Sequence, residues 1–358
     1  MIIRDTKNFS VPVLKEVKMK LAKFLDKYNT VIFDMDGVIT SEQNYWNCAA
    51  LTVWEYLKWN RDGETSIDTE WAEQHLKEIR SRVFCNDEII SVLKSKGVNS
   101  NWDLGYVTVL LAWICNGREY DGDFADVLSL AKTLPDNILD AYDELAKSAS
   151  DMTGFDYDWV RRNNLMWQTM HTLFQEWFLG DELIGNRSMH GRKRGLLHNE
   201  QPIVDKDRLT KMIELLSESK RICTGTGRPY VEMIQPLEDW GIRQYFAKDG
   251  LCNYNNVIVA EKKLNSTFTK PHPYMFLKAL YGTDYDDKKL IGGNYNKNKI
   301  KTTLVVGDAG ADILAAQAMG ADFCAVLTGI QGEKARKYFE NLKAAYILNS
   351  VLDFVEEV

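Results

Sequence analysis

Four carboxylates stand directly after short apolar runs, the position at which ligand-binding residues occur in parallel sheets. Asp34 and Asp36 follow one such run, and Asp308 and Asp312 follow another. Carboxylates that converge at one sheet edge repel one another unless a divalent cation neutralises them. Ligand sets made only of oxygen atoms favour magnesium over zinc. The pattern therefore predicts a Mg2+ site at this edge.

Hydroxyl and basic side chains stand at comparable positions. Thr224 and Thr226 follow a third apolar run, with Gly227 beyond them, and Lys270 opens the sequence Lys-Pro-His-Pro. Taken alone, each has an ordinary explanation: threonine is common in turns, lysine in solvated loops, and Asp308 as a helix cap. Together, and in this order, they predict one shared site.

Strand and helix patterns alternate at both ends of the chain. Short apolar runs predict buried strands at residues 30–33, 221–224, 302–306 and 323–327. Apolar residues at helical spacing predict helices between them, for example at residues 209–216 and 311–319. Alternating strands and helices predict an α/β fold with a parallel sheet covered on both faces. A Lys-rich amphipathic segment before Thr30 predicts a leading helix.

The interval 41–205 has a different character. Apolar and aromatic residues recur there at helical spacing, and it contains nine of the ten tryptophans. We interpret these tryptophans as the packed core of a helical bundle rather than as a ligand cage. The expected architecture is an α/β core domain formed by residues 1–40 and 206–358, with residues 41–205 forming an inserted α-helical domain.

Composition and charge exclude several classes of protein. The chain has 358 residues, a formal net charge of -7 and no long basic tract, so sequence-independent nucleic-acid binding is not predicted. No apolar run is long enough to span a bilayer, and the N-terminal residues lack an uninterrupted apolar stretch of signal-peptide length. We expect a cytoplasmic protein without nucleic-acid or membrane partners, and the sequence leaves its oligomeric state open.

The segments DMDGVIT, TGTGRP, TKPHPYMFLKAL and VVGDAGADILAAQAMG resemble the four ordered motifs of the haloacid dehalogenase (HAD) superfamily. The resemblance covers residues 28–40 and 206–350 and implies a Rossmann-like, HAD-like core. The long insertion resembles the helical cap of members such as phosphoglycolate phosphatase and β-phosphoglucomutase. The resemblance implies a Mg2+-dependent phosphohydrolase that acts on a small phosphorylated metabolite through an aspartyl phosphate.

The resemblance also implies a role for each motif residue. Asp34 is expected to be the nucleophile, and Asp36 the general acid and base. Mg2+ is expected to bind the Asp34 and Asp308 carboxylates and the Asp36 backbone carbonyl. Asp312 is expected to be a further ligand or to orient a bound water. Lys270 is expected to balance the charge of the nucleophile and of a phosphate oxygen.

Two residues are candidates for the phosphate-binding hydroxyl. Alignment on Gly-Arg-Pro selects Thr226, whereas counting from the end of the apolar strand selects Thr224. We favour Thr226. The backbone amide of Gly227 is then expected to be a second phosphate donor.

Two other functions are compatible with the fold that the motifs imply. A phosphomutase resembling β-phosphoglucomutase uses the same core and returns the phosphoryl group to a sugar, and the core motifs do not separate it from a hydrolase. A non-catalytic regulatory protein on this fold is expected to have a damaged acid pair, whereas Asp34 and Asp36 are both present. Asp36 also excludes the dehalogenase branch, because a halide leaves without a proton.

A cationic segment lies near the end of the insertion. Residues 186–203 contain four cations and one anion, so the segment is locally +3 in a chain of -7. Charge runs are usually solvated surface loops. Because this one precedes the return of the chain to the core, it is also placed to face the catalytic carboxylates. We predict that at least one of Arg192, Lys193 and Arg194 contacts a substrate group remote from the transferred phosphate.

Overall fold

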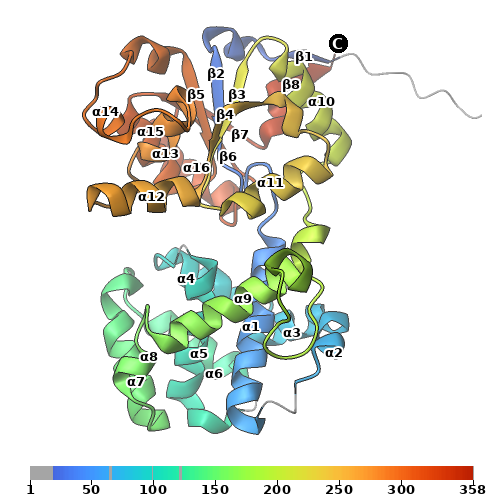
Figure 1. The fold of residues 1–358 in the computed structure, drawn as a ribbon, viewed down its shortest axis with the longest axis vertical. Coiled ribbons are helices and arrows are strands. Elements are labelled where there is room, and N and C mark those ends of the chain that lie inside the picture. Colours follow the sequence, from blue (N-terminus) through green and yellow to red (C-terminus); the bar gives the residue numbers. More distant parts are fainter. Residues whose placement is uncertain (1–18, 64–66, 99, 121–122, 358) are drawn as a thin grey trace, which may run out of the picture.

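The structure, a computed structural model, describes residues 19–63, 67–98, 100–120 and 123–357. Within these residues the chain forms two bodies that lie one above the other in Figure 1. An α/β body is built from both ends of the described chain. A helical body is built from the residues between them, and the chain passes between the two bodies twice.

A six-stranded parallel sheet forms the centre of the α/β body, in the strand order β4-β3-β2-β5-β6-β7. In this order the strands are Phe246–Cys252, Arg221–Gly225, Thr30–Phe33, Thr303–Gly307, Asp322–Val326 and Tyr346–Leu348. β2 lies between β3 and β5 and is buried along its whole length. Strands covered on both faces need apolar residues on both sides, so β2 and β5 are continuous apolar runs. β1 (Met19–Leu21) and β8 (Val355–Glu357) form a separate antiparallel pair.

Helices cover both faces of the sheet (Figure 1). Val31 and Phe33 of β2 belong to an apolar cluster with α10 and α11, whereas Ile32 belongs to a cluster with α12, α13 and α15. The helices of this body are α10 (Lys206–Ser217), α11 (Tyr230–Asp239), α12 (Tyr254–Leu264), α13 (Tyr274–Tyr281), α14 (Asp287–Ile291), α15 (Gly310–Met319) and α16 (Arg336–Asn341). The predicted α/β class with a covered parallel sheet is confirmed.

The helical body has its own apolar core, in which α1 packs against α3, α5 and α9. Its helices are α1 (Gln43–Asp62), α2 (Thr69–Gln74), α3 (Leu76–Val83), α4 (Glu88–Ser95), α5 (Asn101–Asn116), α6 (Phe124–Thr133), α7 (Tyr142–Thr153), α8 (Tyr157–Val160) and α9 (Leu165–Ile184). Trp113 and Trp177 are buried in this core, which confirms that these tryptophans are packing residues. Among the described residues, no helix combines the length and the apolar character needed to cross a membrane.

Two parts of the α/β body differ from the sequence prediction. The described part of the predicted leading helix consists of β1 and a 3-10 helix at Lys23–Lys27, and the remainder lies outside the described residues. Pairing of β1 with β8, at the far end of the chain, overrides the local amphipathic pattern. β4 was not predicted, because it contains the exposed residues Lys248 and Asp249 and pairs with β3 through a register shift.

A buried ion cluster fixes the segment that follows α9. Lys193 Nζ donates to the two Glu55 carboxylate oxygens at 2.9 and 2.8 Å and to Glu176 Oε2 at 2.7 Å. His190 Nδ1 lies 2.8 Å from Glu55 Oε1. None of these side chains is more than 8% exposed. Because a buried charge is tolerated only with partners, the ammonium and the two carboxylates depend on one another.

We expect Lys193→Ala to lower the free energy of unfolding by about 3–5 kcal/mol, because it leaves two buried carboxylates without their cation. The matched control is Arg192→Ala, since Arg192 is the neighbouring cation and is exposed. We expect this control to change the free energy of unfolding by less than about 0.5 kcal/mol. Urea unfolding followed by circular dichroism measures both, and equal stability of the two variants would contradict the role given to Lys193.

Candidate active site

The carboxyl ends of β2 and β5 place two acidic residues next to each other. The strands are parallel and in register, so that Phe33 lies opposite Val306. Asp34 directly follows β2, and its backbone N–H donates to the Val306 carbonyl at 2.9 Å. Asp308 directly follows β5, and Asp312 lies in the first turn of α15. Neighbouring parallel strands end at the same edge, so the sheet itself brings Asp34 and Asp308 together.

Three carboxylates and one ammonium form the centre of this edge. One oxygen from each of Asp34, Asp308 and Asp312 lies within 4.8 Å of the others. Lys270 Nζ lies 3.0 Å from Asp34 Oδ1 and 2.8 Å from Asp312 Oδ1. It also lies 4.8 Å from the centre of the Phe276 ring. Lys270 therefore bridges two of the three carboxylates; we call these three carboxylates and Lys270 the acidic cluster.

The charges of the acidic cluster do not balance. With every group ionised, three carboxylates and one ammonium sum to -2. Burial raises the pKa of Asp34 to about 7 in spite of the opposing charge of Lys270. Burial and the charge of Asp312 also raise the pKa of Asp308 well above its ordinary value. A divalent cation would supply the missing charge, and oxygen-only donors suit Mg2+. The residues therefore fit the metal that the sequence predicts.

Two glycines leave room for the Asp308 carboxylate. A Cβ atom at Gly37 would lie 2.3 Å from Asp308 Oδ2, and a Cβ atom at Gly329 would lie 2.0 Å from the same oxygen. Gly37 also has a φ of 70°, a conformation that glycine adopts without strain. The turn after β2 therefore needs glycine both for its backbone and for the space beside Asp308.

Asp36 lies beside the acidic cluster, and its charge acts on Asp34. Its Oδ1 accepts hydrogen bonds from Arg228 Nε at 3.0 Å, from Arg228 Nη2 at 2.6 Å and from Thr40 Oγ1 at 3.3 Å. The Asp36 side chain is 28% exposed, whereas that of Arg228 is 1% exposed. Asp36 is thus held by a buried cation while part of its carboxylate remains accessible.

The two candidate threonines have different surroundings. Thr224 lies inside β3, and its hydroxyl donates to the Phe33 carbonyl at 2.9 Å, which joins β3 to β2. Thr226 is the first residue after β3, and its Oγ1 accepts a hydrogen bond from the Arg228 N–H at 3.2 Å. A Cβ atom at Gly227 would have nothing within 4 Å. Both threonines are fully buried, so exposure does not separate them, and the choice of Thr226 rests on its position after the end of β3 and beside Gly227.

The residues around Arg228 were not identified from the sequence. Arg228 Nη1 donates to the Glu232 carbonyl at 3.1 Å and to Glu200 Oε2 at 3.4 Å. The guanidinium carbon lies 4.7 Å from the centre of the Tyr45 ring. The Tyr45 hydroxyl donates to Glu232 Oε2 at 2.5 Å. Tyr45 belongs to α1, so this network joins the helical body to the residues that hold Asp36. The motif TGTGRP contains Arg228, but a single sequence does not show its partners.

A second contact from the helical body lies near Asp308. Lys94 of α4 and Glu42, which precedes α1, form an ion pair at 2.5 Å, and both side chains are largely buried. The charge of Glu42 raises the pKa of Asp308, after the larger effects of burial and Asp312, and the charge of Lys94 lowers it. In Figure 1, α4 lies at the end of the helical body that faces the α/β body. Lys94 is therefore a cation of the helical body near the acidic cluster.

The cationic segment has its contacts within the helical body. The Lys193 side chain has no exposed surface, so the prediction that at least one of the three cations contacts a substrate now concerns Arg192 and Arg194. The cause of this burial is the pair of inward-facing glutamates on α1 and α9, which the sequence pattern did not reveal. Arg194 is 74% exposed and lies 3.4 Å from Glu73 and 3.8 Å from Glu70 of α2. Substrate contact by Arg192 or Arg194 stays a prediction.

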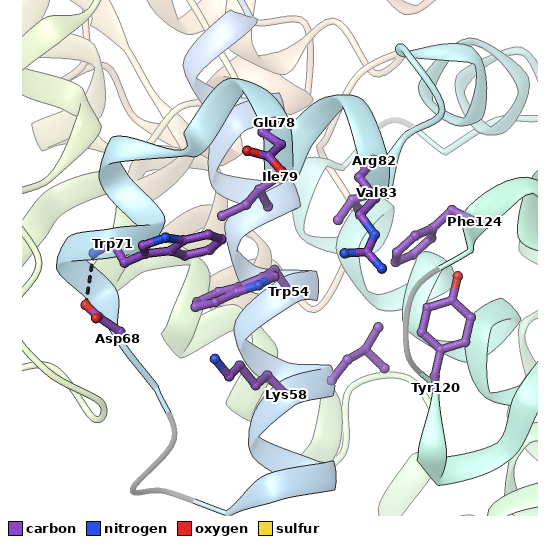
Figure 2. A pocket seen from close by; sticks show the side chains of 11 residues that line it. Trp54, Lys58, Asp68, Trp71, Glu78, Ile79, Arg82, Val83, Tyr120 and Phe124 are labelled. Carbon is purple, nitrogen blue, oxygen red and sulfur yellow. Dashed lines mark hydrogen bonds between the residues drawn. The ribbon is translucent and has the colours of Figure 1, made fainter.

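A cavity of about 470 Å³ lies within the helical body (Figure 2). Its walls include Trp54 and Trp71, whose ring centroids lie 5.9 Å apart, and Tyr120. Figure 2 shows Asp68 turned toward the backbone of Trp71, and the Trp71 N–H donates a hydrogen bond to Asp68 Oδ1 at 2.9 Å. No residue that lines this cavity belongs to the acidic cluster, so we do not assign it to the chemistry of the strand ends.

Comparison with known proteins finds a family model that matches part of the chain and solved structures that resemble most of it. A family model described as HAD-hydrolase-like matches residues 267–354, which include Lys270, Asp308 and Asp312. No curated protein sequence matches the chain. Among solved structures, an X-ray structure of a target of the Northeast Structural Genomics Consortium is 26% identical to this chain. It has a TM-score of 0.74, and the match covers 90% of this chain and 96% of that one.

Two other solved structures are more distant. Phosphatase Tt82 from Thermococcus thioreducens is 18% identical, with a TM-score of 0.49, and the match covers 87% of this chain and 97% of that one. The YfnB protein from Bacillus subtilis, solved with magnesium bound, is 15% identical, with a TM-score of 0.42. Its match covers 90% of this chain and 95% of that one.

The network around Arg228 predicts a dependence of stability on pH. Burial raises the pKa of Glu232 from 4.5 to about 7, although the Tyr45 hydroxyl and the charge of Arg228 oppose the rise. The folded chain therefore binds this proton more tightly than the unfolded chain. The stability that Glu232 contributes is complete below a pH of about 4.5 and is lost as the pH rises through about 7.

We expect Glu232→Gln to make the free energy of unfolding less dependent on pH between about 5 and 7.5, by an amount on the order of 2 kcal/mol. Urea unfolding at a series of pH values measures this. Glu238→Gln, an exposed position on the same helix, is the matched control and should keep the wild-type pH profile. A Glu232→Gln profile parallel to that of the wild type would rule out this contribution.

Proposed function

We propose that the chain, in which residues 267–354 match a HAD-hydrolase-like family model, is a Mg2+-dependent phosphohydrolase of the haloacid dehalogenase superfamily that acts on a small phosphorylated metabolite. The observation that carries this proposal is the acidic cluster at the ends of β2 and β5. There Lys270 bridges Asp34 and Asp312, and Asp36 lies beside them. A nucleophile, a proton donor and cations around one phosphoryl group are the parts that phosphoryl transfer requires.

In the first proposed step Asp34 is the nucleophile. A carboxylate oxygen of Asp34 attacks phosphorus, the bond from phosphorus to the leaving oxygen breaks, and an aspartyl phosphate forms. The leaving oxygen takes a proton from Asp36. The Met35 N–H donates to Asp34 Oδ1 at 2.8 Å, and Lys270 contacts the same oxygen at 3.0 Å, so the nucleophile is held in one orientation. Lys270 also offsets charge on the transferred group.

In the second proposed step water replaces Asp34. The water oxygen attacks phosphorus, its proton goes to Asp36, and the bond from phosphorus to Asp34 breaks. Phosphate leaves, and both carboxyl groups return to their starting states. A group that is 28% exposed and anchored by a buried arginine is suited to this role, because it meets water while keeping its place.

The remaining groups would stabilise the negative charge of the phosphoryl oxygens. Bound Mg2+ would neutralise charge on these oxygens. Its ligands would be the carboxylates of Asp34 and Asp308 and the backbone carbonyl of Asp36, and Asp312 would bind it directly or through water. The Thr226 hydroxyl and the Gly227 N–H are proposed as donors to the phosphoryl group, since both stand at the end of β3, beside β2.

The helical body encloses the site, which supports a small substrate. Trp102 of α5 and Tyr254 of α12 meet across the boundary with ring centroids 6.2 Å apart. Ile330, beyond the end of β6, packs against the core of the helical body. The Asp34 side chain is only 13% exposed. A nucleophile enclosed in this way suits a small soluble phosphate ester better than a phosphorylated macromolecule.

We expect Asp34→Asn to reduce phosphate release by at least about a thousandfold, because an amide is a poor nucleophile. The fold should persist, since the two side chains have nearly the same volume. Phosphate release is measured with p-nitrophenyl phosphate, sugar phosphates, phosphoglycolate and nucleotides in the presence of Mg2+. Asp26→Asn, at an exposed position of the α/β body, is the control and should keep wild-type activity. Retention of a tenth of wild-type activity by Asp34→Asn would refute the assignment.

Activity should require Mg2+. Chelation should abolish phosphate release, and added Mg2+ should restore it, because the acidic cluster lacks the positive charge needed to accept a phosphate group. Ca2+ should inhibit, since its larger and looser coordination misaligns Asp34 and phosphorus. Phosphate release in the presence of each ion measures both effects, and full activity after exhaustive chelation would overturn the metal assignment.

A further inference from the structure

We infer that Arg228 is a positioning residue for Asp36, and that Glu200 and Tyr45 hold Arg228 in the orientation that this requires. The inference rests on the proposed function, because it concerns the proton transfers assigned to Asp36. Arg228 lies directly after the proposed phosphate-binding residues, yet its side chain turns to Asp36 and away from solvent. The role of Arg228 in the site is therefore to position the Asp36 side chain.

The contact between Arg228 and Asp36 selects one carboxylate oxygen. Nε and Nη2 both donate to Oδ1, and Thr40 Oγ1 donates to the same atom. Within the part of the chain that the structure describes, no hydrogen bond to Asp36 Oδ2 is found. Three donors at Oδ1 limit rotation of the carboxylate. Oδ2 is then the oxygen that exchanges a proton with the leaving group and with water.

The rest of the guanidinium is held by other partners. Nη1 donates to the Glu232 carbonyl and to Glu200 Oε2, and the Tyr45 ring lies 4.7 Å from the guanidinium carbon. These three contacts therefore fix the plane and the direction of the Arg228 guanidinium group. A lysine could supply the charge but not the geometry, because its ammonium is a compact donor on a flexible chain.

Hydrogen-bond donors are scarce in this network. Among the residues that the structure describes, Glu200 Oε1 is buried and has no hydrogen-bond partner, and Arg228 is the buried cation between Glu200 and Asp36. The guanidinium is therefore shared among competing acceptors. Tyr45 belongs to the helical body, and Glu200 belongs to the segment that returns from it. Because both contact Arg228, the position of Asp36 depends on the position of the helical body relative to the α/β body.

A purely structural role for Arg228 predicts a different result. If Arg228 only tied the two bodies together, its loss would lower stability and would slow turnover of every substrate alike. If it positions Asp36, its loss should matter most when the leaving group needs a proton. A nitrophenolate departs with little help, whereas an alkoxide does not. Dependence on the leaving group therefore separates the two roles.

The experiment measures kcat and kcat/KM of Arg228→Lys with p-nitrophenyl phosphate, with aryl phosphates of increasing leaving-group basicity, and with the best alkyl phosphate found. We expect the loss of kcat/KM, which reports the first step, to be at least about tenfold larger for the alkyl phosphate than for p-nitrophenyl phosphate. Asp36→Asn should give the steepest dependence, and Glu200→Gln a smaller one in the same direction.

Arg221→Lys is the matched control. Arg221 lies at the other end of β3 and donates to Asp249 at 2.8 Å, so this variant makes the same chemical change in an arginine–aspartate pair outside the site. It should leave the dependence on the leaving group unchanged. Circular dichroism and thermal unfolding of all variants show whether a loss of activity reflects a loss of fold.

An equal loss of kcat/KM with aryl and alkyl phosphates in Arg228→Lys would overturn the inference. Arg228 would then have only a structural role between the two bodies. If Arg228→Lys does not fold, Glu200→Gln decides: a larger loss with the alkyl phosphate supports the inference, and an equal loss or none overturns it. Failure of the wild-type protein to hydrolyse any phosphate ester would instead refute the proposed function, which is a separate result.

Discussion

Excess negative charge at the carboxyl end of the sheet is the constraint on which the rest of the site depends. The pairing of β2 with β5 forces Asp34 and Asp308 together, and Asp312 adds a third carboxylate. Lys270 compensates only part of this charge. The surrounding backbone is shaped around it as well, since Gly37 leaves room for the Asp308 carboxylate. An arrangement of this kind is stable with all groups ionised only when a further cation is bound.

The same rule, that a buried charge must be paired, operates in the helical body with a different result. Lys193 is enclosed by two glutamates and serves the packing of that body, whereas Arg228 is enclosed at the boundary and serves Asp36. The choice of cation agrees with the task. A point charge is sufficient to neutralise converging carboxylates, whereas holding one carboxylate oxygen in a set direction needs the planar fork of arginine.

The strand-end residues could be predicted because their positions follow from local pattern. Asp34 and Asp308 each follow a continuous apolar run, and parallel topology then places them at one edge. β4 could not be predicted in this way, because its exposed charged residues hide the strand pattern. The partners of Arg228 and Lys193 depend on contacts between residues far apart in the chain. A local charge count treats Arg192 and Lys193 alike, although one is exposed and the other is buried.

Electrostatics also limits how a substrate reaches this edge. A phosphate ester carries negative charge and approaches a cluster that already has an excess of carboxylates. The nearby cation of the helical body, Lys94, is paired with Glu42 at 2.5 Å, so the pair contributes little net attraction. Attraction must therefore come from Lys270 and from the metal that the carboxylates are suited to hold. With every carboxylate ionised and no metal bound, a phosphate ester would meet net repulsion, so under the proposed function the charges favour binding of the metal before the ester.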